Sequence, residues 1–160
     1  MEKNKNVIIF MPFIGIGGVE KNLFIISNYL INKVKNLSIC TSSNKYKKKF
    51  DKKIKFISPQ KKVSDNLNIK IRYILCLILL FKLFLKNRHF TVISFQANIY
   101  CILLCKIFNV QVIVRSNSSP SGWYHNNFKK FIYKKIISLA DEVIVNSDDF
   151  KKEMEKKFNI

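Results

Sequence analysis

A turn with three glycines lies near the start of the chain, between an apolar run and an amphipathic helical pattern. Gly15, Gly17 and Gly18 are three of the four glycines in the 160-residue sequence. Glycine lets the backbone turn sharply, and its missing side chain lets a ligand approach the main chain where a helix begins, a place that often binds phosphate. The sequence therefore predicts a ligand-binding turn of the phosphate-binding kind.

Two common nucleotide-binding fingerprints are absent from this turn. Position 20 is Glu, where G-x-G-x-x-G has its third glycine, and no G-K-[ST] follows. The charge of Glu20 suits the N-terminus of a helix, but it repels a phosphate unless a cation such as Lys21 screens it. The sequence thus predicts neither a dinucleotide fingerprint nor a P-loop.

Hydrogen-bonding side chains also follow several later apolar runs. In a parallel α/β sheet the ligand crevice lies beyond the carboxyl ends of the strands, so these positions are the most informative about function. Most of these groups are polar and uncharged, which suits a polyhydroxylated ligand such as a sugar or nucleotide-sugar. Each residue alone has an alternative role as a turn former or helix cap. The candidate binding residues are Gly17, Gly18, Glu20, Lys21, Gln96, Asn98, Arg115, Ser116, Asn117, Asn146 and Ser147.

Short apolar runs alternate with helical patterns, a rhythm typical of βαβ units. The sequence predicts a single Rossmann-like α/β domain over residues 1–160, with a parallel sheet flanked by helices. We expect strands at residues 7–11, 37–41, 55–57, 91–95, 111–114 and 142–145. We expect helices at residues 18–32, 68–86, 97–108, 124–139 and 148–158.

The formal net charge is +19, yet only three of the 29 basic residues are arginines and the lysines are spread along the chain. This distribution makes nucleic acid an unlikely partner. It is also what an A/T-rich genome produces at tolerant surface positions. In the helix expected over residues 68–86, basic residues flank a short uncharged run. This helix therefore either packs under the sheet or rests on an anionic membrane surface.

The four cysteines lie within apolar runs, without a C-x-x-C pair, and are expected to be buried in a reducing compartment. We therefore expect no metal and no bound cofactor. The first apolar run is short and ends at Pro12, so it lacks the long core of a secretory signal. A cytoplasmic location follows, with peripheral attachment to the inner face of the plasma membrane as a further expectation.

Four segments in order resemble the N-terminal domain of the family 4 glycosyltransferases, which have the two-lobed GT-B fold. They are PFIGIGGVEK, VISFQAN, VIVRSNSSP and ADEVIVNS. The G-G-x-E and A-D-x-V-I-x-x-S pieces are the most distinctive. The resemblance implies the acceptor-side lobe of an enzyme that transfers a sugar from a nucleotide-sugar, with retention of configuration and without an essential metal.

The resemblance also implies roles for individual residues. Gly17 and Gly18 would approach the phosphate and sugar of the donor from across the cleft. Arg115, followed by Ser116 and Asn117, would bind the acceptor or stabilise charge on the leaving group, although an arginine here has the alternative of pairing with a carboxylate. Independently of the resemblance, aromatic side chains stack on sugar rings, so we expect the loop that contains Trp123, Tyr124 and His125 to flank a sugar acceptor, with a plain loop or cap residue as the alternative for His125.

Similar enzymes carry their nucleotide site and an E-x7-E motif in a second domain, and no two glutamates here lie eight positions apart. We therefore expect the C-terminal donor-binding domain to be missing and the chain to be inactive alone. The expected protein is half of a bacterial enzyme that glycosylates a glycolipid or polysaccharide. Two alternatives stay open: a basic, non-enzymatic module that binds anionic membrane or nucleic acid, and a nucleotide-binding α/β protein such as a reductase.

Overall fold

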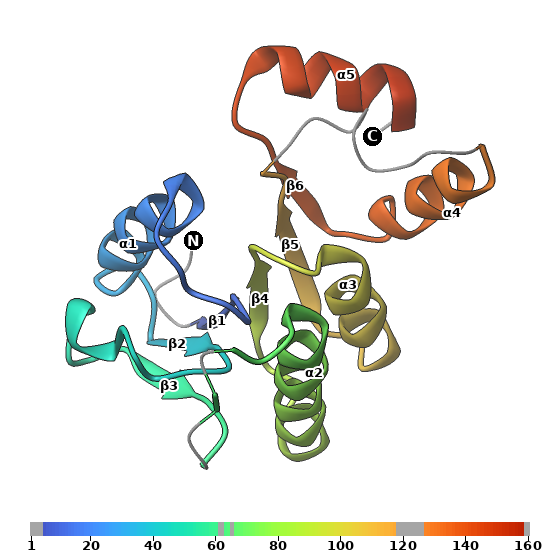
Figure 1. Cartoon of the computed structure of the whole chain (residues 1–160). Coiled ribbons are helices and arrows are strands. Elements are labelled where there is room, and N and C mark those ends of the chain that lie inside the picture. Colours follow the sequence, from blue (N-terminus) through green and yellow to red (C-terminus); the bar gives the residue numbers. More distant parts are fainter. Residues whose placement is uncertain (1–4, 61–62, 65, 118–126, 159–160) are drawn as a thin grey trace.

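The computed structural model describes residues 5–60, 63–64, 66–117 and 127–158. These residues form one six-stranded parallel sheet with the order β3-β2-β1-β4-β5-β6 (Figure 1). The strands are β1 (Asn6–Phe10), β2 (Asn36–Cys40), β3 (Lys55–Ile57), β4 (Thr91–Ser94), β5 (Gln111–Arg115) and β6 (Glu142–Ile144). The helices are α1 (Gly18–Leu30), α2 (Ile69–Lys86), α3 (Asn98–Ile107), α4 (Asn127–Ile137) and α5 (Asp148–Phe158), with a short 3₁₀ turn η1 (Lys47–Lys49).

Both faces of the sheet are buried, because successive side chains of a strand point to opposite faces. In β1, Ile8 and Phe10 join one apolar core, while Val7 and Ile9 join the other. The first core packs against α2, α3 and α4, and the second packs against α1. Figure 1 accordingly shows α1 on one side of the sheet and α2 and α3 on the other.

The predicted fold class is confirmed: the protein is α/β, Rossmann-like, with a parallel sheet flanked by helices. The strand boundaries agree with the sequence prediction to within about a residue, because the Val- and Ile-rich runs are short and sharply bounded. For α4 the expected start at residue 124 lies outside the described residues, and the described helix begins at Asn127.

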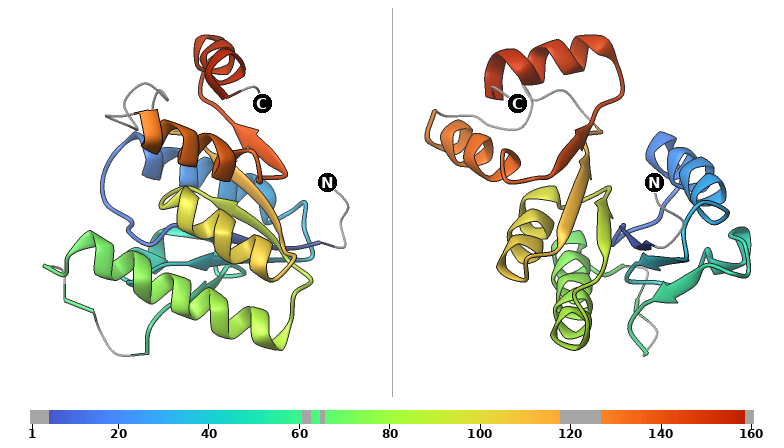
Figure 2. Two further views of the ribbon diagram at one scale, coloured as in Figure 1. Left: turned by 90° about the vertical axis from the view of Figure 1, so that its right-hand side faces the viewer. Right: turned by 180° about the vertical axis from the view of Figure 1, so that it is seen from behind.

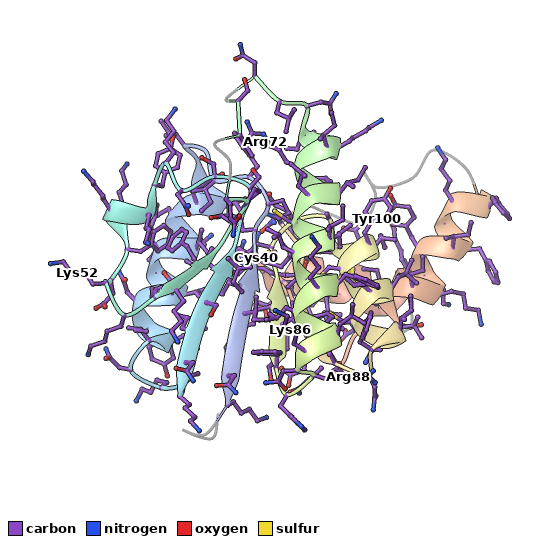
Figure 3. All side chains as sticks on the ribbon, turned by 90° about the horizontal axis from the view of Figure 1, so that it is seen from below. Cys40, Lys52, Arg72, Lys86, Arg88 and Tyr100 are labelled. Carbon is purple, nitrogen blue, oxygen red and sulfur yellow. The ribbon has the colours of Figure 1, made fainter. Side chains whose placement is uncertain are left out.

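The four cysteines are buried, as predicted. All four belong to the core between the sheet and α2 and α3, and Figure 3 shows Cys40 between β2 and α2. Burial raises the pKa of the Cys40 thiol well above its usual value. In the described ranges, no three His, Cys, Asp or Glu side chains form a group that could hold a metal ion. Among the described helices, none is long and apolar enough to pass through a membrane.

The turn before β6 is fastened by Asp141. Its carboxylate lies 2.8 Å from Lys106 Nζ, and its Oδ2 accepts a hydrogen bond of 2.7 Å from the backbone N–H of Val112. Partial burial raises the pKa of Asp141, but the hydrogen bonds from Lys106 and Val112 outweigh it, so the net shift is downward. One side chain thus joins the end of α3 to β5 and β6.

Replacing Leu80 tests the core of the helical layer. Leu80 is fully buried, whereas Ile78, two residues away on α2, is 44% exposed. Leu80→Ala should lower the free energy of unfolding by about 2–5 kcal/mol, because it leaves a cavity. Ile78→Ala, the matched control, should cost less than about 1 kcal/mol. Urea unfolding measures both, and similar losses would contradict the assignment of these two faces of α2.

Replacing Asp141 tests its ionic contact. A carboxyl whose pKa is lowered by folding stabilises the protein above the unfolded pKa of about 4, and this contribution disappears as the pH falls through the folded pKa. Asp141→Asn should therefore melt below the wild type at pH 7, and the two melting temperatures should converge as the pH falls below the lowered pKa of Asp141. A difference that does not change with pH would contradict this role.

Candidate functional site

The site is built where the strand order reverses. From β1, the strands β2 and β3 follow on one side and β4, β5 and β6 on the other. The connections on the two sides run in opposite directions, so a crevice is expected beyond the carboxyl ends of β1 and β4. One hydrogen bond crosses this point: the backbone N–H of Phe13 donates to Gln96 Oε1 at 3.0 Å. The predicted glycine turn after β1 and the predicted polar segment after β4 are therefore neighbours.

The turn after β1 is supported from the side of α2 by Arg72. This side chain is only 3% exposed, and its guanidinium lies 5.1 Å from the centre of the Phe13 ring. It also donates to Ser42 Oγ at 3.1 Å and to the carbonyls of Ser64 and Leu67 at 2.9 and 3.1 Å. A buried charge with several acceptors fixes the position of Phe13, and with it the start of the turn.

The glycine turn holds a carboxylate of its own. Glu20 Oε1 accepts a hydrogen bond of 3.1 Å from the backbone N–H of Gly15, and a Cβ on Gly17 would lie 3.0 Å from Glu20 Oε2. A Cβ on Gly18 would meet nothing within 4 Å. Gly17 and Gly18 are exposed, and so is Lys21. The turn is therefore open to solvent at Gly18, while Glu20 places a negative charge on its inner side.

A second set of hydrogen bonds joins the ends of β4 and β5. The hydroxyl of Ser94 donates to Asn98 Oδ1 at 2.8 Å and also lies 3.0 Å from the carbonyl of Gln96. Asn98 Nδ2 in turn donates to the carbonyl of Arg115 at 3.0 Å. Ala97, between Gln96 and Asn98, has φ 53° and ψ 36°, a left-handed conformation that is uncommon for alanine. These contacts fix the start of α3 against β5.

Arg115 binds amides rather than a carboxylate among the described residues. Its two terminal nitrogens donate to Asn117 Oδ1 and, at 2.7 Å, to Asn146 Oδ1. The guanidinium lies 5.4 Å from the centre of the Phe95 ring, and the residue is only 5% exposed. Burial lowers the pKa of Arg115, whose unperturbed value is so high that the side chain stays charged at neutral pH. Asn117 also donates to the carbonyl of Phe95 at 2.6 Å, so Arg115 positions the segment that follows β5.

Beside this network lies a pocket of about 480 Å³. It lies beyond the carboxyl ends of β4 and β5, where α2, α3 and α4 come together. Four of the predicted site residues line it, together with aromatic and aliphatic side chains from the three helices. The described lining residues are Tyr73, Phe95, Gln96, Ala97, Asn98, Ile99, Tyr100, Ser116, Asn117, Tyr133 and Ile137.

The pocket is neutral and can make both stacking and hydrogen-bonding contacts. Among the described residues that line it, only tyrosines are ionisable. Burial raises the pKa of Tyr73, so this hydroxyl stays protonated at neutral pH. Gln96 Nε2 and the hydroxyls of Tyr73 and Tyr100 have no hydrogen-bond partners among the residues that the structure describes. Such a site suits a ligand with hydroxyl groups and a ring face, and the described lining residues include no carboxylate or imidazole for proton transfer.

The predicted site residues fall into three groups. Gln96, Asn98, Ser116 and Asn117 line the pocket. Arg115 and Asn146 are not among the described lining residues; Arg115 donates to both Asn117 and Asn146. Ser147 accepts from the backbone N–H of Phe150 at 3.3 Å and caps α5. The turn residues follow β1, whereas the pocket lies beyond β4 and β5. They are Gly17, Gly18, Glu20 and Lys21. The predicted loop with Trp123, Tyr124 and His125 lies outside the described residues.

Sequence analysis missed the aromatic half of the pocket. Tyr73, Tyr100 and Tyr133 each come from a different helix, and nothing in the order of the sequence indicates that three tyrosines meet. Their only local signal is that each tyrosine lies in an otherwise aliphatic or basic helical pattern. Ser94 was assigned to a strand and not to the site, although its hydroxyl fixes Asn98.

No protein-family model matches the chain, and no curated protein sequence matches it. The solved structures to which the chain is similar include GT-B glycosyltransferases. UGT73P12 of Glycyrrhiza uralensis, complexed with glycyrrhetinic acid 3-O-monoglucuronide, superposes on 98% of this chain with a TM-score of 0.65 at 11% identity. A UGT transferase from Siraitia grosvenorii in complex with UDP (TM-score 0.49, 17% identity) and UGT2 of Phytolacca americana complexed with UDP-2fluoro-glucose and pterostilbene (0.45, 12%) match 72% and 73% of this chain.

The similarity to the Glycyrrhiza structure shows the fold. The chain spans 47% of the Glycyrrhiza protein and 28% and 32% of the other two, so it corresponds to less than half the length of each. The similarity to the Glycyrrhiza enzyme extends over nearly all of this chain, so the resemblance to a GT-B glycosyltransferase lobe is supported at the level of architecture.

The role of Arg115 can be tested by a conservative substitution. Arg115→Lys keeps the charge but cannot reach both amides, so it should lower the free energy of unfolding by about 1–2 kcal/mol. The control is Arg88→Lys, since Arg88 is exposed and its described contact is with the ring of Phe108. It should change stability by less than about 0.5 kcal/mol. Equal effects in urea unfolding would contradict a positioning role for Arg115.

Proposed function

We propose that this chain is the acceptor-binding lobe of a glycosyltransferase that moves a sugar from a nucleotide-sugar to an acceptor. The observation that carries the proposal is the neutral, tyrosine-lined pocket at the carboxyl edge of the sheet, into which Gln96, Asn98, Ser116 and Asn117 converge. Its combination of aromatic faces and amides fits a sugar or another hydroxylated ring. The GT-B fold of the structural neighbours supports the same chemistry.

The absence of an ionisable group other than tyrosine among the described lining residues favours binding over catalysis within this lobe. A transferase needs positive charge near the departing nucleoside diphosphate. Arg115 is already held by two amides, and the carboxylate of Glu20 opposes a phosphate placed deep in the glycine turn. We therefore assign most of the donor contacts to a second, C-terminal lobe, which makes the present chain inactive alone.

In this proposal the turn at Gly17 and Gly18 faces the donor across the cleft. The space beside Gly18 is open, so the backbone can lie close to the donor sugar or its distal phosphate. Lys21, exposed one turn further along α1, offsets part of the charge of Glu20. Retention of configuration, a glycolipid or polysaccharide acceptor and a metal-free reaction remain parts of the proposal that rest on the family resemblance.

The reductase alternative is weaker than the transferase. A nucleotide-binding protein of unrelated chemistry would not need polar residues from several strands around one cleft, whereas β4 and β5 both supply them here. The basic, non-enzymatic module has independent support in the charge of the helical layer. That surface lies on the same helices that line the pocket, so the two functions are compatible.

The pocket can be tested with Tyr100→Ala. Tyr100 is 60% exposed, so the substitution should not disturb folding. Ligand-observed NMR with a panel of mono- and oligosaccharides and glycolipid headgroups should detect binding to the wild type, and Tyr100→Ala should weaken it about 3–10-fold, because a stacking face is lost. Tyr29→Ala, at a residue 64% exposed on α1, is the matched control and should leave binding unchanged. If no saccharide binds, or if both variants behave alike, the pocket is not an acceptor site.

The glycine turn can be tested in a two-lobe enzyme, made by joining the chain to the donor-binding lobe of a GT-B glycosyltransferase. Gly18→Val should reduce transfer at least about 100-fold, because the new side chain blocks the close approach of the donor. It should leave the melting temperature nearly unchanged, because a Cβ at this position meets nothing within 4 Å. Ile16→Val, in the same turn and 93% exposed in the wild type, should keep both properties. Full activity of Gly18→Val would contradict a donor-proximal turn.

A further inference from the structure

One long part of the chain contains no acidic residue. Between positions 66 and 140 there is no Asp or Glu, although the stretch has eleven basic residues, and all ten acidic residues of the protein lie outside it. This part includes α2, α3 and α4, which cover the same face of the sheet. The charge of the protein is therefore unevenly placed, with one helical layer wholly basic.

The same layer exposes large apolar side chains. On α2 they recur every three or four residues, which places them along one stripe opposite the buried Cys76, Leu80 and Phe84. Between 44% and 61% of each side chain in this stripe is exposed. A helix with apolar residues on both faces is unusual at a protein surface. The stripe consists of Ile71, Ile74, Ile78, Phe81 and Leu85.

Two neighbouring helices extend the stripe. The three helices lie side by side when the protein is seen from this side (Figure 2, left), and α3 contacts both α2 and α4. Phe81 of α2 packs edge-on against Phe108 at the end of α3, with ring centres 5.4 Å apart. We call the exposed set the apolar helix face: the α2 stripe with Tyr100, Leu103 and Ile107 of α3 and Phe128, Phe131 and Ile132 of α4.

Basic side chains border the apolar helix face. Lys70, Lys82 and Lys86 flank the stripe on α2 and are exposed. Figure 3 shows Lys86 and Arg88 together at one end of this helix. On α4, Lys135 Nζ lies 5.7 Å from the centre of the Phe131 ring. Long basic side chains beside apolar ones can place their charged ends at lipid head groups while the apolar groups enter the acyl boundary.

We propose that the apolar helix face docks onto an anionic lipid bilayer. Charge complementarity selects this occupant, since a wholly basic border attracts the acidic head groups of a membrane. A second copy of the chain would bring two basic borders together, which opposes association. Nucleic acid would match the charge, but it gives no reason to expose a row of isoleucines and phenylalanines. A donor-binding lobe of the proposed kind would cover the carboxyl edge of the sheet, whereas the stripe runs along α2 on its outer side.

The position of the pocket connects this surface to the proposed function. Tyr73, Tyr100 and Tyr133, which line the pocket, come from α2, α3 and α4 in turn. Docking of these helices would hold the pocket near the lipid surface. If the proposed transferase function holds, the acceptor is then a lipid-linked saccharide that stays in the membrane.

Vesicle sedimentation tests docking with the 160-residue chain alone, without donor or acceptor. Vesicles of phosphatidylcholine with about a third phosphatidylglycerol should bind the protein, and vesicles of phosphatidylcholine alone should bind it much more weakly. The double variant Ile74→Ser/Ile78→Ser should lower the partition coefficient on the order of tenfold, because the apolar contact is lost. Lys82→Gln/Lys86→Gln should lower it by a similar factor on the anionic vesicles.

Matched controls change the same residue types elsewhere. Ile25→Ser/Tyr29→Ser alters two exposed residues of α1, on the opposite face of the sheet. Lys52→Gln/Lys53→Gln removes two exposed charges, and Figure 3 shows Lys52 well away from α2. Both controls should bind vesicles nearly as the wild type does, and circular dichroism should show all four variants folded. Docking is overturned if the wild type does not bind anionic vesicles in low salt. It is also overturned if the α2 variants bind as well as their controls, or if duplex DNA competes fully while the serine variants bind unchanged. None of these outcomes depends on sugar binding.

Discussion

The structure depends on the requirement that both faces of a parallel sheet be covered. The central strands are apolar on both sides, so α1 must shield one face of the sheet while α2, α3 and α4 shield the other. Polar groups collect at the carboxyl edge of the sheet, where buried ones such as Arg72 and Arg115 are satisfied by hydrogen bonds. At the carboxyl edge, the reversal of strand order between β1 and β4 separates the loops and leaves space between them. The pocket and the glycine turn both lie at that edge.

Polar residues at this edge mainly hold one another. Arg115, Asn117 and Asn146 form a unit in which one cation is shared by two amides, and Asn98 connects β4 to β5. What remains for a ligand among the described residues is a smaller set of groups, chiefly the Gln96 amide and the hydroxyls of Tyr73 and Tyr100. This division explains how a site can contain an arginine and still present a neutral surface. It also explains why a separate source of positive charge is needed for phosphate chemistry.

The sequence predicted the elements well and the site in part. Val- and Ile-rich runs such as residues 7–10 and 111–114 are recognisable because burial on both faces leaves no room for polar residues. The positions after each strand could be predicted because parallel strands end at one edge. Tyr73, Tyr100 and Tyr133 could not, since their meeting depends on how three helices pack. The contact between Glu20 and Gly15 was also beyond sequence analysis, because the direction of a side chain within a turn follows from the backbone path.

The buried cysteines can report how often the core opens. Cys40, Cys76, Cys101 and Cys105 are all shielded from solvent, and they lie under the layer formed by α2 and α3. Because all four sulfur atoms are buried, an alkylating reagent can reach them only when that layer lifts from the sheet. The rate at which they become modified therefore reports how often the helices separate from the strands, and a ligand or surface that clamps those helices would slow it.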